Sequence, residues 1–183
     1  MSFFLVSVAV AVAVALLAGG SLRSVLDTRL EATWSLFLAL GLQIALDVFW
    51  RDGGSGLGSV LLILSYGLLV GFCFANMGLK GMTVVAIGIA CNALVITVNE
   101  GMPVRTPPGT ITETVKHHPE RASDDLVFLS DIIVVDPLNQ ALSFGDLIMV
   151  VGLADLLVHR SRAGRDSGPT RRRRVDDLQA LTL

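Results

Sequence analysis

The sequence contains five apolar stretches, at residues 3–18, 32–50, 57–75, 82–98 and 142–158. An α-helix rises 1.5 Å per residue, so about 20 mainly apolar residues are needed to cross a hydrocarbon core about 30 Å thick. None of the five stretches contains proline. In lipid they can satisfy their backbone hydrogen bonds only as helices, because an open sheet edge would leave N–H and C=O groups unpaired. The pattern therefore predicts an all-α membrane fold, a bundle of about five transmembrane helices.

The composition supports this class and leaves no room for a separate soluble domain. Hydrophobic residues make up 52% of the chain and charged residues 16%, and the mean hydropathy is +0.68. Soluble domains carry about a quarter charged residues. We expect one transmembrane bundle over residues 1–159, with an outer loop at 99–141, followed by a tail at 160–183.

The basic residues predict the orientation of the bundle. No Lys or Arg precedes the first apolar stretch, whereas Arg23 and Arg29 follow it. This order favours an uncleaved helix with its N-terminus outside over a cleaved signal peptide, which is the alternative for residues 3–18. The inner segments then hold ten of the 14 Lys and Arg residues. We therefore expect a multi-pass protein of the plasma membrane with a cytoplasmic C-terminus.

The tail at 160–183 is basic and low in complexity. It contains seven Arg, four of them consecutive from Arg171 to Arg174. Basic residues just inside a membrane are attracted to anionic lipid headgroups by about 1 kcal/mol each. We expect a disordered tail that binds such headgroups and fixes the topology, in preference to one that binds nucleic acid.

Small residues in the apolar stretches mark faces where helices can approach closely. Gly67 and Gly71 form a G-x-x-x-G motif, and Ser7, Ala11 and Ala15 are spaced four residues apart. Packing within the monomer is the preferred interpretation. A homodimer is the alternative.

The loop at 99–141 is long in a chain whose other connections are short, which is typical of a functional or a disordered segment. Its apolar run at 126–135 is too short to span a bilayer, and Pro137 would end it. The run is therefore re-entrant, interfacial or extended.

Polar residues within the apolar stretches gather in the outer half of the predicted bundle. They are Asp47, Asn92, Asn99 and Asp146. An ionisable residue inside a span is costly and normally has a partner, so such a set is a functional-site hypothesis. The loop offers Lys116, Arg105 or Arg121 as partners. The structural alternatives are that Asp146 caps a helix start together with Ser143, and that Asp47 simply reaches the interface.

His117 and His118 are adjacent in the loop. A zinc site needs three or four converging ligands, and the loop lacks a His pair spaced i, i+4 or paired C-x-x-C motifs. We therefore predict an exposed or hydrogen-bonded loop pair, with no metal and no cofactor. Asp155 is expected to pair with His159 one helical turn later.

Three strings resemble motifs of an uncharacterised, actinobacterial-type membrane family of unknown function, close to DUF5317. They are CNALVITVNEGMPV at 91–104, DIIVVDP at 131–137 and SFGDLIMVVG at 143–152. Asn99 and the Gly-Met-Pro-Val at 101–104 fit the family turn, whereas Glu100 departs from it. The resemblance implies a small multi-pass protein of bacterial plasma membranes, and it implies no established activity.

These observations predict a binding site at the outer face and no catalytic residues. The predicted site consists of Asp47, Asn92, Asn99, Lys116, His117, His118, Asp131, Ser143 and Asp146. We expect a non-enzymatic membrane protein whose outer cap binds a partner, a lipid headgroup or a small ligand. The alternative is a small transporter or a membrane-embedded enzyme, although internal repeats and broken helices, which are typical of transporters, are not evident.

Overall fold

The computed structural model describes residues 22–50, 56–105, 114–135 and 140–163, together with residue 13. The predicted first helix at 3–18, its signal-peptide alternative and the tail from Arg171 to Arg174 lie outside these residues. The helices are α2 (Leu22–Leu26), α3 (Thr33–Phe49), α4 (Gly56–Ala75), α5 (Met82–Asn99), the 3-10 turn η1 (Val127–Leu129) and α6 (Phe144–Ala163). The strands are β1 (Met102–Val104), β2 (His117–Pro119), β3 (Ile133–Val135) and β4 (Gln140–Leu142).

The mostly helical prediction is confirmed, and the helices predicted at 32–50, 57–75 and 82–98 begin and end close to the expected residues. The last helix needs a correction at both ends. Leu142 belongs to β4, so α6 begins at Phe144, and it continues to Ala163. Residues 160–163, which were expected to begin the disordered tail, are therefore helical. Here the guanidinium of Arg160 donates to the hydroxyl of Thr28 at 2.9 Å.

Two of these helices, α4 and α5, are long and apolar enough to cross a membrane, judged by length and composition. The apolar α3 is shorter, with 17 residues. Although α6 has 20 residues, it carries Asp146, Asp155 and Arg160 along its length.

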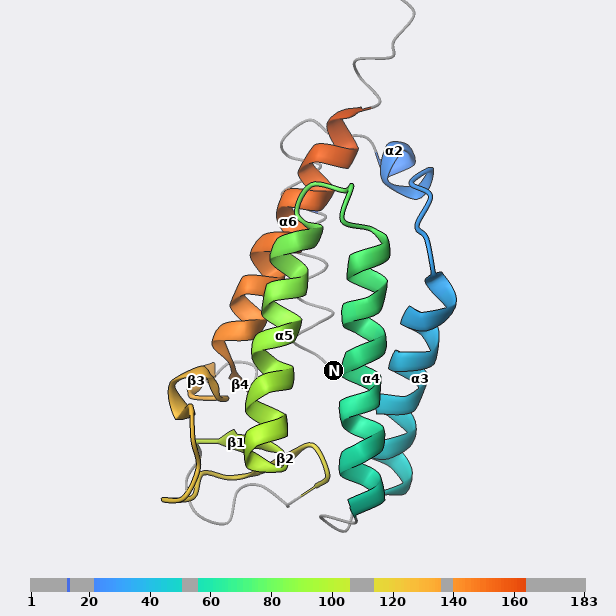
Figure 1. The fold of residues 1–183 in the computed structure, drawn as a ribbon. Coiled ribbons are helices and arrows are strands. Elements are labelled where there is room, and N and C mark those ends of the chain that lie inside the picture. Colours follow the sequence, from blue (N-terminus) through green and yellow to red (C-terminus); the bar gives the residue numbers. More distant parts are fainter. Residues whose placement is uncertain (1–12, 14–21, 51–55, 106–113, 136–139, 164–183) are drawn as a thin grey trace, which may run out of the picture.

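The long helices pack in chain order, α3 on α4, α4 on α5 and α5 on α6 (Figure 1). The closest pair is α5 and α6, which run antiparallel. They meet at two glycines from each of the two segments, and in each segment the two glycines are seven residues apart. A Cβ placed on Gly88 would lie 2.5 Å from the carbonyl oxygen of Gly145, and one on Gly81 would collide with that of Gly152. The missing side chains let the two backbones touch at two levels.

The G-x-x-x-G motif of α4 does not take part in this packing. A Cβ on Gly67 or Gly71 would have no heavy atom of the described chain within 4 Å, and both glycines are exposed. The expectation that they pack inside the monomer therefore does not hold for the described helices, and the other predicted face, Ser7 with Ala11 and Ala15, is not described. Close helix packing occurs instead between glycines that are spaced seven residues apart.

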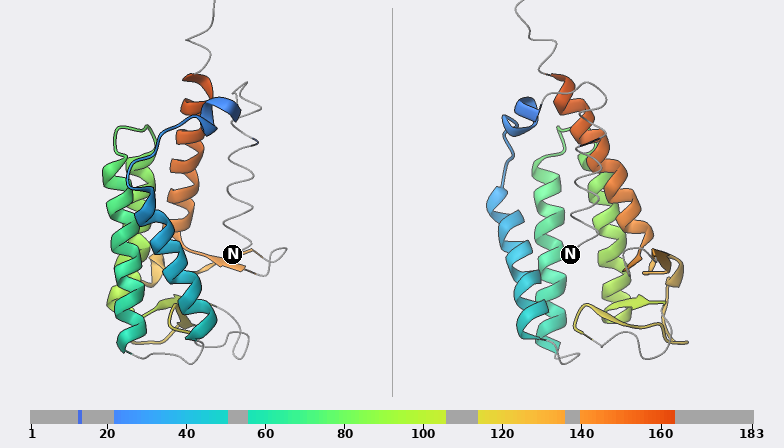
Figure 2. Two further views of the ribbon diagram at one scale, coloured as in Figure 1. Left: turned by 90° about the vertical axis from the view of Figure 1, so that its right-hand side faces the viewer. Right: turned by 180° about the vertical axis from the view of Figure 1, so that it is seen from behind.

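The segment between α5 and α6 folds across one end of these helices (Figures 1 and 2). It forms two small sheets, in which β1 pairs with β2 in parallel and β3 pairs with β4 in antiparallel orientation. A bridge between Val104 and Asp131 connects them. The run at 126–135 consists of η1 followed by β3, so among the three alternatives it is an extended segment with one short turn.

Gly88→Ala should destabilise the protein, because the new methyl group would force α5 and α6 apart. We expect a loss of about 1–3 kcal/mol, as for other overpacked interiors. Thermal unfolding of the purified protein in detergent would measure it. The matched control is Gly67→Ala, which has open space around it and should leave the melting temperature unchanged or slightly higher. Equal melting temperatures for both variants would contradict the close approach.

Candidate functional site

The start of α6 is tied to α5 by a closed set of hydrogen bonds. The hydroxyl of Ser143 accepts from the backbone N–H of Asp146 at 2.9 Å, and the carboxylate of Asp146 accepts from the N–H of Ser143 at 3.2 Å. This reciprocal pair is a capping box, which satisfies donors that the first helical turn would otherwise leave free. The structural alternative proposed for Asp146 is thus present in the fold.

Asn92 extends the capping box across to α5. Its amide nitrogen donates to Asp146 at 2.9 Å, and its amide oxygen accepts from the hydroxyl of Ser143 at 2.9 Å. Asn92 and Ser143 are buried, and Gly145 leaves the space that the Asn92 amide fills. The side chains of Ser143 and Asn92 are therefore buried in a junction that holds α5 and α6 together.

Asp131 forms the β-bridge with Val104 of β1. Its N–H donates to the carbonyl of Pro103 at 3.1 Å, and its carbonyl accepts from the N–H of Arg105 at 3.0 Å. The carboxylate is only 10% exposed and lies 3.6 Å from Nε2 of His117. Burial, together with the negative charge of Asp146, raises the pKa of Asp131 to about 7, while Lys116 opposes the shift.

The pKa of His117 moves in the opposite direction. Partial burial lowers it, and the positive charge of Lys116 adds to the effect. At neutral pH an uncharged imidazole therefore lies beside a carboxyl group whose pKa is raised toward neutrality.

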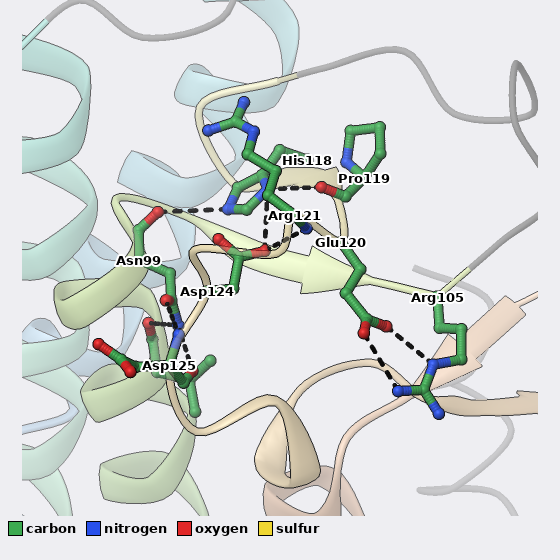
Figure 3. A network of polar contacts seen from close by, with 9 residues as sticks. Asn99, Arg105, His118, Pro119, Glu120, Arg121, Asp124 and Asp125 are labelled. Atoms are coloured by element: carbon green, nitrogen blue, oxygen red, sulfur yellow. Dashed lines mark hydrogen bonds and ion pairs between the residues drawn. The ribbon is translucent and has the colours of Figure 1, made fainter.

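A second network fixes the loop to the end of α5 (Figure 3). The amide of Asn99 pairs with the backbone of Asp125 in both directions, accepting at 2.7 Å and donating at 2.8 Å. The ring of His118 contacts the carbonyls of Asn99 and Pro119 at 3.2 and 2.9 Å. The carboxylate of Asp124 lies 3.9 Å from the same ring and also accepts from the N–H of Arg121 at 2.7 Å.

Asp47 lies apart from these networks. It lines a small recess of about 10 Å³, room for about one water molecule, between the loop and the ends of α3 and α4. The recess is lined by Gln43, Leu46, Asp47, Leu62, Thr114, Val115 and Lys116. It therefore combines an acidic and a basic side chain with an apolar wall, and it is where Lys116 and Asp47 of the predicted site come near each other.

The predicted residues thus lie at one end of the helices but in four separate groups. The groups are Asn92 with Ser143 and Asp146, His117 with Asp131, Asn99 with His118, and Asp47 with Lys116. The described residues include no cluster of three or more His, Cys, Asp or Glu side chains suited to a metal ion.

Not all of the loop cations pair with the helix residues predicted as their partners. Arg105 pairs with Glu120, at 2.8 and 3.2 Å, instead of with an acid of the helices. The expected pair of Asp155 and His159 is present at 2.9 Å, far from the site.

Sequence reasoning missed Asp124, Asp125 and Ser130. Asp125 anchors the loop to Asn99, 26 positions earlier, whereas Asp124 contacts His118 and Arg121 within the loop. The sequence offers no periodic signal for either set of contacts. Ser130 is fully buried, and its hydroxyl has no hydrogen-bond partner within the described part of the chain. Its place beside Asp131 in an otherwise apolar run was the only available signal.

A family model described as a family of unknown function, DUF5317, matches residues 27–158. The chain belongs to this family. The match covers α3 to α5, the following loop and α6 as far as residue 158, and so includes every residue of the candidate site. No curated protein and no solved structure matches the chain. Membership in DUF5317 therefore adds no activity, and the function has to be argued from the site itself.

Asp131→Asn should change how stability depends on pH. The folded protein keeps the Asp131 proton up to about pH 7, whereas an unfolded Asp loses it near pH 4, so this group lowers stability as pH rises across that window. The lowered pKa of His117 acts in the opposite direction. Removing the carboxyl should make the slope of unfolding free energy against pH more positive than in the wild type, by up to about 1.4 kcal/mol per pH unit.

Melting curves of the purified protein between pH 4.5 and 7 would measure this slope. Asp27→Asn is the control, because Asp27 is largely exposed at the far end of the molecule and should leave the slope unchanged. Parallel curves for the wild type and Asp131→Asn would show that Asp131 is ionised like an exposed acid.

Proposed function

We propose that this DUF5317 protein is a multi-pass membrane protein whose loop between α5 and α6 forms a polar cap at the outer face of the membrane. The observation that carries the proposal is the distribution of side chains. Large apolar residues point outward along the helices, as at Phe37, Val60 and Val151, which are 61 to 71% exposed. Polar residues such as Ser65 and Asn92 are buried instead.

This arrangement suits a lipid solvent and not water. An exposed apolar surface that continues over several helices is a liability in water, whereas in a bilayer it meets lipid tails. With 1.5 Å per residue, the 20 residues of α4 extend about 30 Å, the thickness of a hydrocarbon core. The bias of Lys and Arg supports the five-span topology with the loop outside and the C-terminus inside.

Labelling of single cysteines tests this topology. Ser123→Cys in the loop and Lys80→Cys at the opposite helix ends are both exposed positions, and they are compared in a background in which Cys73 and Cys91 are alanine. A membrane-impermeant maleimide should label Ser123→Cys in intact cells and Lys80→Cys only after permeabilisation. The reverse pattern would invert the orientation, and labelling of both in intact cells would contradict the span.

We further propose that Asp47 and Lys116, at the rim of the recess, bind the headgroup of a zwitterionic phospholipid at the protein surface. The two side chains provide an ammonium for the phosphate and a carboxylate for the lipid amine. Leu46, Leu62 and Val115 form the buried apolar floor beneath these two side chains. The recess lies where the loop meets the helix ends, which is the depth of the headgroups in the proposed topology.

Native mass spectrometry of detergent-purified protein with phosphatidylethanolamine tests the ligand. Lys116→Gln and Asp47→Asn should each reduce the retained lipid by about tenfold, equivalent to the loss of one charged contact of about 1.4 kcal/mol. The controls are Lys80→Gln and Asp27→Asn, which change the same residue types at the opposite end. Equal retention by all four variants, or retention of phosphatidylglycerol alone, would exclude a zwitterionic headgroup at this recess.

A further inference from the structure

We infer that the loop segment 126–134 is an interfacial anchor that binds the outer leaflet, with Phe128 and Val134 placed among the upper acyl chains of its phospholipids. The segment is extended in conformation, and the inference concerns its location. It rests on the proposed membrane topology and adds the place where the loop itself touches lipid.

The first observation is that the polarity of this segment is the reverse of what water favours. Its only polar residues are Ser130 and Asp131. Ser130 is fully buried and Asp131 nearly so, whereas Phe128 is 61% and Val134 is 53% exposed. Scattered exposed apolar residues are ordinary in a protein, but buried polar residues beside exposed large apolar ones are informative. An apolar face turned outward is what a segment at the boundary between headgroups and acyl chains presents to the lipid.

The exposed apolar surface of the segment continues onto α6. Phe144, Leu147 and Val151 are exposed, and their spacing of three and four residues places them on one face of the helix. This face extends about 10 Å along the helix axis. The segment adjoins it, because β3 pairs with β4, which leads into α6, and η1 lies against both α5 and α6. The segment is thus continuous with a helix face that meets lipid tails in the proposed topology, which favours lipid as its occupant over a protein partner.

The level of β3 and β4 along the helices supports the same location. Both strands lie nearer the middle of α5 than β1 and β2 do, although β1 to β4 all belong to the connection between α5 and α6 (Figures 1 and 2). The segment therefore reaches deeper into the proposed bilayer than β1 and β2.

The backbone of the segment is suited to a place with little water. The consecutive N–H groups of residues 129 to 132 all donate to carbonyl oxygens, at 2.8 to 3.1 Å. β3 adds its ladder with β4. Lipid-exposed irregular backbone does not occur within the hydrocarbon region itself, because unpaired peptide groups are costly there. The segment therefore fits the boundary between headgroups and acyl chains, where its side chains reach the chains and its backbone does not.

Spin labels on single cysteines test this contact in the full-length protein in lipid nanodiscs. The labelled variants are Phe128→Cys and Val134→Cys, in the cysteine-free background of the topology experiment. Oxygen partitions into lipid and a neutral nickel chelate into water, so the ratio of their collision rates with the label reports on its surroundings. The ratio should be several-fold higher at both positions than at Ser123→Cys, an exposed position of the same loop, and should approach the ratio at Val151→Cys on α6.

The controls separate this inference from the topology on which it rests. A water-like ratio at Phe128→Cys and Val134→Cys with a lipid-like ratio at Val151→Cys would overturn the anchor and leave the topology standing. A water-like ratio at Val151→Cys as well would overturn both. Labels shielded from both reagents would reveal a protein surface over the segment, from a partner or a second copy of the chain, and would also overturn the anchor.

Hydroxyl-radical oxidation of the wild type in nanodiscs covers the case in which the labelled variants do not fold. After correction for intrinsic reactivity, Phe128 should be protected as strongly as Phe37 on α3, although both are exposed in the protein alone. The exposed side chain of Arg105, in the same loop, should react. Oxidation of Phe128 as rapid as that of Arg105 would overturn the inference.

Discussion

The backbone contact between α5 and α6 is the constraint on which the rest of the described structure depends. Glycines on the two helices face each other at two levels, 81 against 152 and 88 against 145, and no larger residue fits there without moving a backbone. Close backbone packing and buried hydrogen bonds hold the two helices together at this contact. The amide of Asn92 supplies those hydrogen bonds one turn beyond the second glycine pair, where it meets the capping box of α6.

The loop between α5 and α6 packs across the end of this helix pair. The last turn of α5 offers carbonyl oxygens and the first turn of α6 offers N–H groups, and both need partners. The amide of Asn99 donates to the carbonyl of Val95 in the last turn of α5, and it also pairs with the backbone of Asp125 in the loop. Asn76, at the other end of the molecule, repeats the arrangement with the backbone of Glu31 and the carbonyl of Phe72. Asparagine at a helix end thus pins an incoming segment at both faces of the fold.

The candidate site shows how far sequence reasoning reached. The positions of Asn92, Asn99 and Asp146 along their apolar stretches correctly predicted that they lie at one end of the helices, because each residue advances a helix by a fixed distance. Position alone could not show which of these side chains would form hydrogen bonds within the protein. Asn92 and Asp146 share a closed hydrogen-bond network with Ser143, whereas Asp47 lies on the rim of a small recess with Lys116. That division separates a helix junction from a surface that can meet a ligand.

The sequence by itself determined the helices, their approximate ends and the polar cap as a segment, since these follow from local hydropathy, proline and capping residues. Only the tertiary structure decided which glycines matter: Gly67 and Gly71 form the familiar motif but face outward, while the glycines of α5 and α6 do the packing. It also decided the environments of Asp131 and His118, whose partners come from distant parts of the chain. The physical reason is that hydropathy acts residue by residue, whereas close packing and the charge of a buried group depend on which surfaces meet in space.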